Sequence, residues 1–184
     1  METPRIDILK FNVADVQFPV FVLGAHGAGK SVLLKEIVKT RGDDPNLVVV
    51  DGEVVENPLL LRKPPRSDRW ENSRPVRDAL GKGELLVAAT SMLFREPDAC
   101  CLLGCVFVFA GNMSRAQLRE VYRLYCLPPQ PFDVKTFETI ATTLSEAYTA
   151  IVIDNKRHAV TWYRAASPRP RDLRWFSRAI EKTT

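Results

Sequence analysis

Residues 24–31, Gly-Ala-His-Gly-Ala-Gly-Lys-Ser, constrain the fold of this chain more than any other stretch. They match the pattern G-x-x-x-x-G-K-[ST] at every fixed position. The apolar run 18–23 before them is typical of a buried strand, and the run 32–38 after them is typical of a helix. A strand, a glycine-rich loop and a helix in this order predict a phosphate-binding loop (P-loop) at a helix N-terminus. The alternative is a glycine-rich turn that matches the pattern by chance.

Each residue type in this loop suits the binding of a nucleotide with a divalent cation. Glycines let the backbone curl so that successive N–H groups point at an anion. Lys30 is expected to reach the β- and γ-phosphates of ATP, and the Ser31 hydroxyl to bind Mg²⁺. His26 is expected to face solvent rather than to take part in chemistry. The predicted nucleotide-binding residues are Gly24, Ala25, His26, Gly27, Ala28, Gly29, Lys30, Ser31 and Val32.

The alternation of strands and helices along the chain predicts an α/β fold with a mostly parallel sheet flanked by helices. An alternating run at 6–11 predicts a short leading strand. Continuous apolar runs predict buried strands at 47–50, 85–89 and 101–109. These strands are expected to lie in one sheet with the strand before the P-loop.

The second half of the chain carries signals for two helices and a hairpin. Residues 114–117, Ser-Arg-Ala-Gln, form a capping box that predicts a helix start, and Asp133 is expected to cap the next helix. The runs 148–153 and 159–163 flank a polar tetrad and predict a C-terminal β-hairpin.

Length and composition predict one domain over residues 1–165, with a basic tail or terminal helix at 166–184. The formal net charge is +4, and basic residues gather in a proline-rich loop at 62–82 and in the segment 164–182. Both segments are candidates for contacts with the phosphates of double-stranded DNA. The alternative for the second segment is an amphipathic helix whose charges are simply solvated.

Other features favour a cytoplasmic or nuclear protein without a membrane partner. No apolar run approaches the roughly 20 residues of a membrane span, and the first residues lack the apolar core of a secretory signal. Reduced thiols are expected at the four cysteines, Cys100, Cys101, Cys105 and Cys126.

Polar residues at strand ends are candidates for the rest of a nucleotide site. Asp51 and Asp154 each end an apolar run, and the carboxyl ends of parallel strands gather at one edge of a sheet. Asp51 is therefore a candidate for the Mg²⁺ shell, with a turn that leaves the strand as the alternative. Asp154 is expected in the hairpin turn. Thr90 could place a hydroxyl near the γ-phosphate. The predicted catalytic residues are Lys30, Asp51 and Thr90, and the predicted metal ligands are Ser31 and Asp51.

In the order of these segments, the chain resembles the genome-packaging ATPases of nucleocytoplasmic large DNA viruses, within the FtsK–HerA superfamily of P-loop motors. The similar stretches are 6–37, 47–57 and 118–165, about half of the chain, and the P-loop is the specific motif among them. The resemblance implies a P-loop ATPase fold, ATP-driven translocation of DNA, a ring of subunits and a place in the viral factory or virion.

The chain also departs from that family's pattern. The family has an apolar strand ending in paired acidic residues between the strands at 47–50 and 85–89, and residues 61–84 contain none. Thr90 and Ser91 stand where the family has a glutamine sensor, and Lys82 where it has an arginine. ATP binding therefore carries over to this chain, whereas efficient hydrolysis is in doubt.

Three functions follow from these observations. The first is an ATP-driven packaging motor or DNA translocase. The second is a non-catalytic nucleotide-binding relative with a structural or regulatory role. The third is a small P-loop kinase for a nucleoside or another metabolite, in which residues 62–82 would form a cationic lid.

Overall fold

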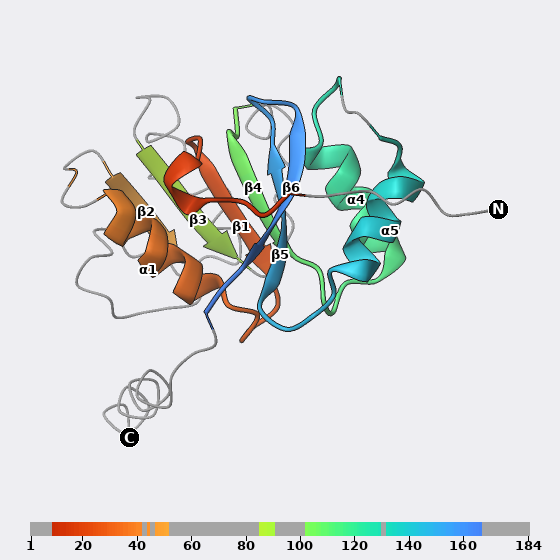
Figure 1. Cartoon of the computed structure of the whole chain (residues 1–184), viewed down its shortest axis with the longest axis horizontal. Helices are drawn as coiled ribbons and strands as arrows, with labels where there is room; N and C mark the ends of the chain where they lie inside the picture. Colours follow the sequence, from red (N-terminus) through yellow and green to blue (C-terminus); the bar gives the residue numbers. More distant parts are fainter. Residues whose placement is uncertain are drawn as a thin grey trace, which may run out of the picture.

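The strands in the described part of the chain form one mixed β-sheet. A computed structural model describes residues 9–41, 44, 47–51, 85–90, 102–129 and 132–166. Within these residues the sheet has six strands in the order β2-β3-β1-β4-β5-β6 (Figure 1). The strands are β1 (Val20–Gly24), β2 (Leu47–Asp51), β3 (Leu85–Thr90), β4 (Cys105–Phe109), β5 (Thr149–Asp154) and β6 (Ala159–Arg164). β2, β3, β1 and β4 run parallel, and β5 and β6 add an antiparallel hairpin, so the predicted fold class is confirmed.

Helices cover both faces of this sheet (Figure 1). Successive side chains of a strand point to opposite faces, so β1 contributes to two cores. Val20 and Val22 pack with α1 (Lys30–Arg41) and with residues around the short 3-10 helix η1 (Val13–Asp15). Phe21 and Leu23 pack with α4 (Arg115–Tyr125) and α5 (Val134–Thr143). The fully apolar strands predicted from the sequence are apolar because both of their faces are covered.

Side chains at the helix starts behave as the sequence predicts. The Ser114 hydroxyl accepts a hydrogen bond from Gln117 N at 3.3 Å, and Gln117 Oε1 accepts one from Ser114 N at 2.8 Å. Asp133 Oδ1 accepts from Thr136 N at 2.9 Å, and this bond holds the pKa of Asp133 below its usual value. Both predicted caps are therefore confirmed.

Two predicted strands, which correspond to β1 and β4, begin later than expected. The prediction at 18–23 corresponds to β1 from Val20, and the prediction at 101–109 corresponds to β4 from Cys105. Gly104, just before β4, packs against the segment before β1. A Cβ at Gly104 would lie 2.4 Å from Gln17 O, and Gly104 N donates to Pro19 O at 2.8 Å. This crossing of two segments stops the strand pairing at that end.

The C-terminal hairpin is confirmed, with its turn at 155–158. Asp154 Oδ1 accepts hydrogen bonds from Lys156 N at 3.1 Å and Arg157 N at 2.9 Å, which is the turn role expected for this residue. The neighbouring Asn155 is 7% exposed and lies further inside than a turn residue usually does. Its side chain accepts from Leu127 N at 3.2 Å and donates to Leu103 O at 3.4 Å, so it ties the hairpin to two other segments.

Several predictions fall outside the described residues. They concern the loop 62–82, Ser91, the first two cysteines and the tail 167–184 with its terminal helix. Of the leading strand at 6–11 only the end is described, where Lys10 forms an isolated parallel bridge with Trp162. In the described part of the chain, every helix is too short or too polar to cross a membrane.

Candidate functional site

The P-loop lies at the middle of the sheet edge where the parallel strands end. Leu23 of β1 is opposite Thr90 of β3, and Gly24 is opposite Phe109 of β4. In α/β sheets, ligands bind outside the carboxyl ends of the strands. The loop therefore has strand ends on both of its sides, and these two sides differ in chemistry.

The loop itself has the strand–loop–helix arrangement expected from its sequence. β1 ends at Gly24 and α1 begins at Lys30. Gly27 and Gly29 have positive φ angles of 75° and 112°, which glycine adopts at little cost. The first turn of α1 contains no acidic residue, so nothing there opposes an anion at the positive end of the helix dipole.

Lys30 is buried at the centre of the loop, with 4% of its surface exposed. Its Nζ donates to Gly24 O at 2.7 Å and to Ala25 O at 2.8 Å. Burial of an ammonium group is costly unless it is hydrogen-bonded, and these two carbonyls satisfy that need. The loop thus holds a cation against its own first residues, at the place where a phosphate chain would enter.

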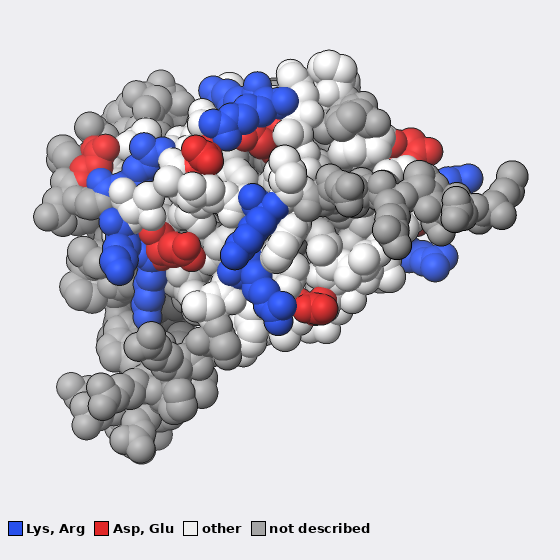
Figure 2. Space-filling model, in the orientation of Figure 1, with Lys and Arg blue, Asp and Glu red and all other residues white. Residues whose placement is uncertain are grey.

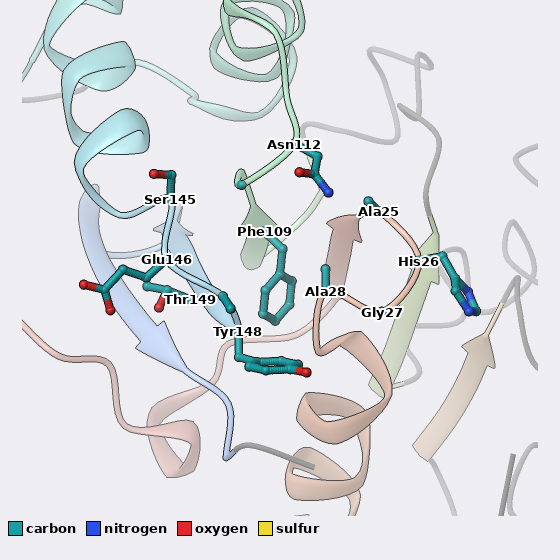
Figure 3. A pocket seen from close by; sticks show the side chains of 12 residues that line it. Ala25, His26, Gly27, Ala28, Phe109, Asn112, Ser145, Glu146, Tyr148 and Thr149 are labelled. Atoms are coloured by element: carbon teal, nitrogen blue, oxygen red, sulfur yellow. The ribbon is translucent and has the colours of Figure 1, made fainter. Parts of the chain in front are cut away.

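The other loop residues take three different positions. Ser31 is half-buried in the first turn of α1, and Val32 is half-buried against the core on the α1 side of the sheet. His26 is exposed, as expected from the sequence. Figure 3 shows its side chain on the outer side of the loop, away from Tyr148.

The two candidates on neighbouring strands lie at unequal distances from the loop. Thr90 ends β3, the strand directly beside β1. Asp51 ends β2, one strand further, and is opposite Ala89. At about 4.8 Å between strands, the backbone of Asp51 lies roughly 10 Å from β1. Within the described ranges, no group of three His, Cys, Asp or Glu residues is arranged to hold a metal ion.

A pocket of about 280 Å³ opens on the other side of the loop, over β4 and β5. Three segments that are far apart in the sequence line it, namely 25–28 of the loop, residues 109, 111 and 112 at and after the end of β4, and 145–149, which lead into β5. In Figure 3 the rings of Phe109 and Tyr148 lie between the loop and the segment with Ser145 and Glu146. This pocket was not predicted from the sequence, because no local pattern joins the three segments.

Tyr148 has an unusual backbone at the base of this pocket. It was predicted as the first residue of a strand, but β5 begins at Thr149 and Tyr148 has φ 64°. A bulky residue at positive φ is uncommon and costs energy. Its carbonyl accepts a hydrogen bond from Ala165 N at 2.8 Å, which fixes it to the end of β6. Its ring Cδ1 would lie 3.2 Å from a Cβ placed at Gly29, so the ring packs against the loop.

The charged surface of the described residues is divided into separate groups. Figure 2 shows Lys and Arg side chains in several clusters on one face, with acidic and uncharged surface between them. Some of these charges are paired, as in Arg164 with Glu146 at 3.2 Å and Arg157 with Asp154 at 3.6 Å. Of the segments predicted to contact DNA, the structure describes residues 164–166.

Comparison with known proteins gives a structural likeness rather than a sequence relative. No protein family model and no curated protein matches this chain. Among solved structures, the chain is similar to the genome packaging NTPase B204 from Sulfolobus turreted icosahedral virus 2, which was solved in complex with AMP. The TM-score is 0.54 at 12% sequence identity, over 85% of this chain and 100% of B204. The chain thus has an α/β, P-loop NTPase-like fold, which it shares with a viral packaging NTPase.

Proposed function

We propose that this chain binds ATP with Mg²⁺ through residues 24–32 and that it is a relative of the viral genome-packaging ATPases. The observation that carries the proposal is the position of Lys30, buried and hydrogen-bonded to Gly24 O and Ala25 O at the N-terminus of α1. The similarity to B204, a packaging NTPase solved with AMP, supports the same conclusion.

The residues around the loop fit the needs of Mg²⁺ bound together with a nucleotide. Mg²⁺ keeps several waters and is usually held by one or two protein oxygens and by the phosphates of the substrate. Ser31 in the first turn of α1 would supply a hydroxyl, and Asp51 at the end of β2 is the candidate carboxylate.

Calorimetric titration with ATP and Mg²⁺ tests the binding. Lys30→Met keeps most of the side-chain volume but removes the charge, and loss of a buried charged partner costs about 2 kcal/mol or more, or roughly 30-fold in Kd. Lys35→Met, which alters an exposed residue of the same helix, is the matched control and should leave Kd within about twofold of the wild type. Equal affinities of wild type and Lys30→Met would refute the proposed site.

Turnover separates a motor from a non-catalytic relative. If the chain is a motor, it hydrolyses ATP, and duplex DNA bound through segments 62–82 and 164–182 stimulates the reaction. Asp51→Asn and Thr90→Val should then lower turnover more than they lower ATP affinity, since each would act where the γ-phosphate is cleaved. Stimulation by DNA should weaken steeply with added salt, because the contacts are to phosphates.

One observation favours the second candidate, a relative that binds ATP without hydrolysing it. In the described sheet, β2 pairs directly with β3 and β3 with β1, so the strand with paired acidic residues that the resemblance implies has no place between them. Tight ATP binding without turnover, in the presence and absence of DNA, would support this candidate. Phosphate transfer to a nucleoside would instead support a kinase.

A further inference from the structure

We infer that the pocket over β4 and β5 holds the purine base of the nucleotide, with Tyr148 as its stacking surface; this rests on the proposed function. The two sides of the P-loop differ in the groups they offer. On the β3 side, Thr90 and Asp51 end their strands and suit the phosphate and metal end of a nucleotide. On the β4 side lie two aromatic rings and a pocket of about 280 Å³, close to the low end of ligand pockets, about 300–1,000 Å³.

The two aromatic rings of this pocket, Phe109 and Tyr148, pack against the loop at Gly29. A Cβ placed at Gly29 would lie 3.2 Å from Tyr148 Cδ1 and 3.3 Å from Phe109 Cε1. Gly29 directly precedes Lys30, so the two rings lie next to the residue that would hold the phosphates. Phe109 is 3% exposed, whereas Tyr148 is half-buried and retains surface for a ligand. Stacking of a base on an aromatic side chain tolerates different bases, and it is stronger for the larger ring system of a purine than for that of a pyrimidine.

The backbone of Tyr148 has a strained conformation, with φ 64°. The surrounding structure therefore holds its ring in one position. Strained residues persist where the surroundings over-determine them, and they cluster at ligand sites. Here Tyr148 O accepts from Ala165 N at 2.8 Å and Thr149 N donates to Glu146 O at 3.1 Å, so the residue is fixed from both sides. An aromatic ring fixed before binding loses little conformational entropy when a base stacks on it.

A residue that lines the same pocket has a polar group without a partner in the part of the chain that the structure describes. Thr149 is 5% exposed and lines the pocket, and its Oγ1, which is itself covered, makes no hydrogen bond to the described residues. Buried hydroxyl groups are nearly always paired, so an unpaired one in a pocket indicates a missing polar partner. The edge of a purine carries both donors and acceptors and would supply that partner once the Thr149 side chain turned its hydroxyl toward the pocket. Stacking on Tyr148 and an edge contact to Thr149 together would select a base over a bare phosphate chain.

Titration with ATP and with inorganic tripolyphosphate, each with Mg²⁺, distinguishes the base from the phosphates. Wild type should bind ATP at least tenfold more tightly than tripolyphosphate. Tyr148→Ala should raise the Kd of ATP about tenfold and leave that of tripolyphosphate within twofold, since stacking concerns the base alone. Tyr148→Phe is the matched control and should bind ATP within about threefold of wild type. Thr149→Val, of nearly the same shape, should weaken ATP binding about threefold and spare tripolyphosphate.

The ratio of the affinities for ATP and for tripolyphosphate tests the base pocket independently of phosphate binding by the P-loop. If wild type binds tripolyphosphate as tightly as ATP, the pocket does not hold the base, although the P-loop still binds phosphate. If Tyr148→Ala weakens both ligands equally, the ring supports the loop rather than the base, and the inference is wrong. If wild type binds neither ligand, the proposed function itself fails and this inference fails with it.

Discussion

Gly27 and Gly29 both have positive φ angles, but the space around them differs. A Cβ at Gly27 would meet no atom within 4 Å, whereas a Cβ at Gly29 would lie 3.2 to 3.3 Å from Tyr148, Ala165 and Phe109. The conformation alone penalises any other residue at both positions, by about 1–2 kcal/mol. Only at Gly29 does crowding add to this penalty.

We therefore expect Gly29→Ala to destabilise the protein more than Gly27→Ala. Gly27→Ala should lower the free energy of unfolding by about 1 kcal/mol. Gly29→Ala should lower it by about 1–3 kcal/mol more than Gly27→Ala does, because three neighbours must move. Urea denaturation of the two variants measures the difference. Similar losses for both variants would mean that the neighbours of Gly29 yield without cost.

Two buried cysteines should make stability depend on alkaline pH. Burial raises the pKa of Cys105 to about 12, partly opposed by a hydrogen bond from Gln17 N, and burial also raises the pKa of Cys126 to about 12. The usual value is 9.0. Above pH 9 the unfolded thiols lose protons that the folded thiols keep, so stability is complete below pH 9 and declines as pH rises toward 12.

Single substitutions measure this contribution. Between pH 8 and pH 10.5, stability should decline by about 2 kcal/mol less in Cys105→Ala, and similarly in Cys126→Ala, than in wild type. Comparison of slopes rather than absolute stabilities removes the cost of the cavity that each substitution creates. Parallel declines in all three proteins would show that these thiols do not titrate on unfolding.

At the scale of elements, the capping box is a local device whose removal should not reach the P-loop. Ser114→Ala should lower the free energy of unfolding by about 1 kcal/mol, because Gln117 N loses its acceptor at the start of α4. ATP affinity should be unchanged, since α4 packs on the face of the sheet opposite α1. Lys135→Ala, at an exposed position of α5, serves as the control for a surface change and should alter stability by less than about 0.5 kcal/mol.

The elements of this fold that could be predicted are those determined by residues close together in the sequence. The strand and helix around the P-loop, the caps at Ser114 and Asp133, and the terminal hairpin follow from residues a few positions apart. Strand order was not predictable, because it depends on contacts between segments without a shared pattern. The pocket was not predictable for the same reason. The roles of Thr90 and Asp51 stay predictions.

Asn155 illustrates a residue whose importance the sequence could not reveal. It was predicted as part of a polar hairpin loop, which it is. It also bridges Leu127 N and Leu103 O from a buried position, and its own N–H donates to Gly104 O at 2.9 Å. An asparagine in a turn needs no such partners, so nothing in the local sequence distinguishes this one.

At the scale of the whole molecule, bound nucleotide should stabilise the fold. A ligand that binds the folded state alone adds about 2.7 kcal/mol at a concentration 100 times its Kd. ATP with Mg²⁺ should therefore raise Tm in wild type and leave Tm of Lys30→Met almost unchanged. Thermal denaturation with increasing ATP measures this effect. An equal rise in both proteins would place the ligand away from Lys30.

The antiparallel hairpin returns the chain to the edge where the P-loop lies. Arg164 is opposite Thr149, and a Cβ at Gly29 would lie 3.3 Å from Ala165 Cβ. The end of the hairpin at Ala165 therefore lies beside the glycine loop, whereas the hairpin tip at Arg157 lies at the opposite edge of the sheet. A fluorescent label attached at Ala166 would sense what occupies the loop, and one at Arg157 would serve as its silent reference.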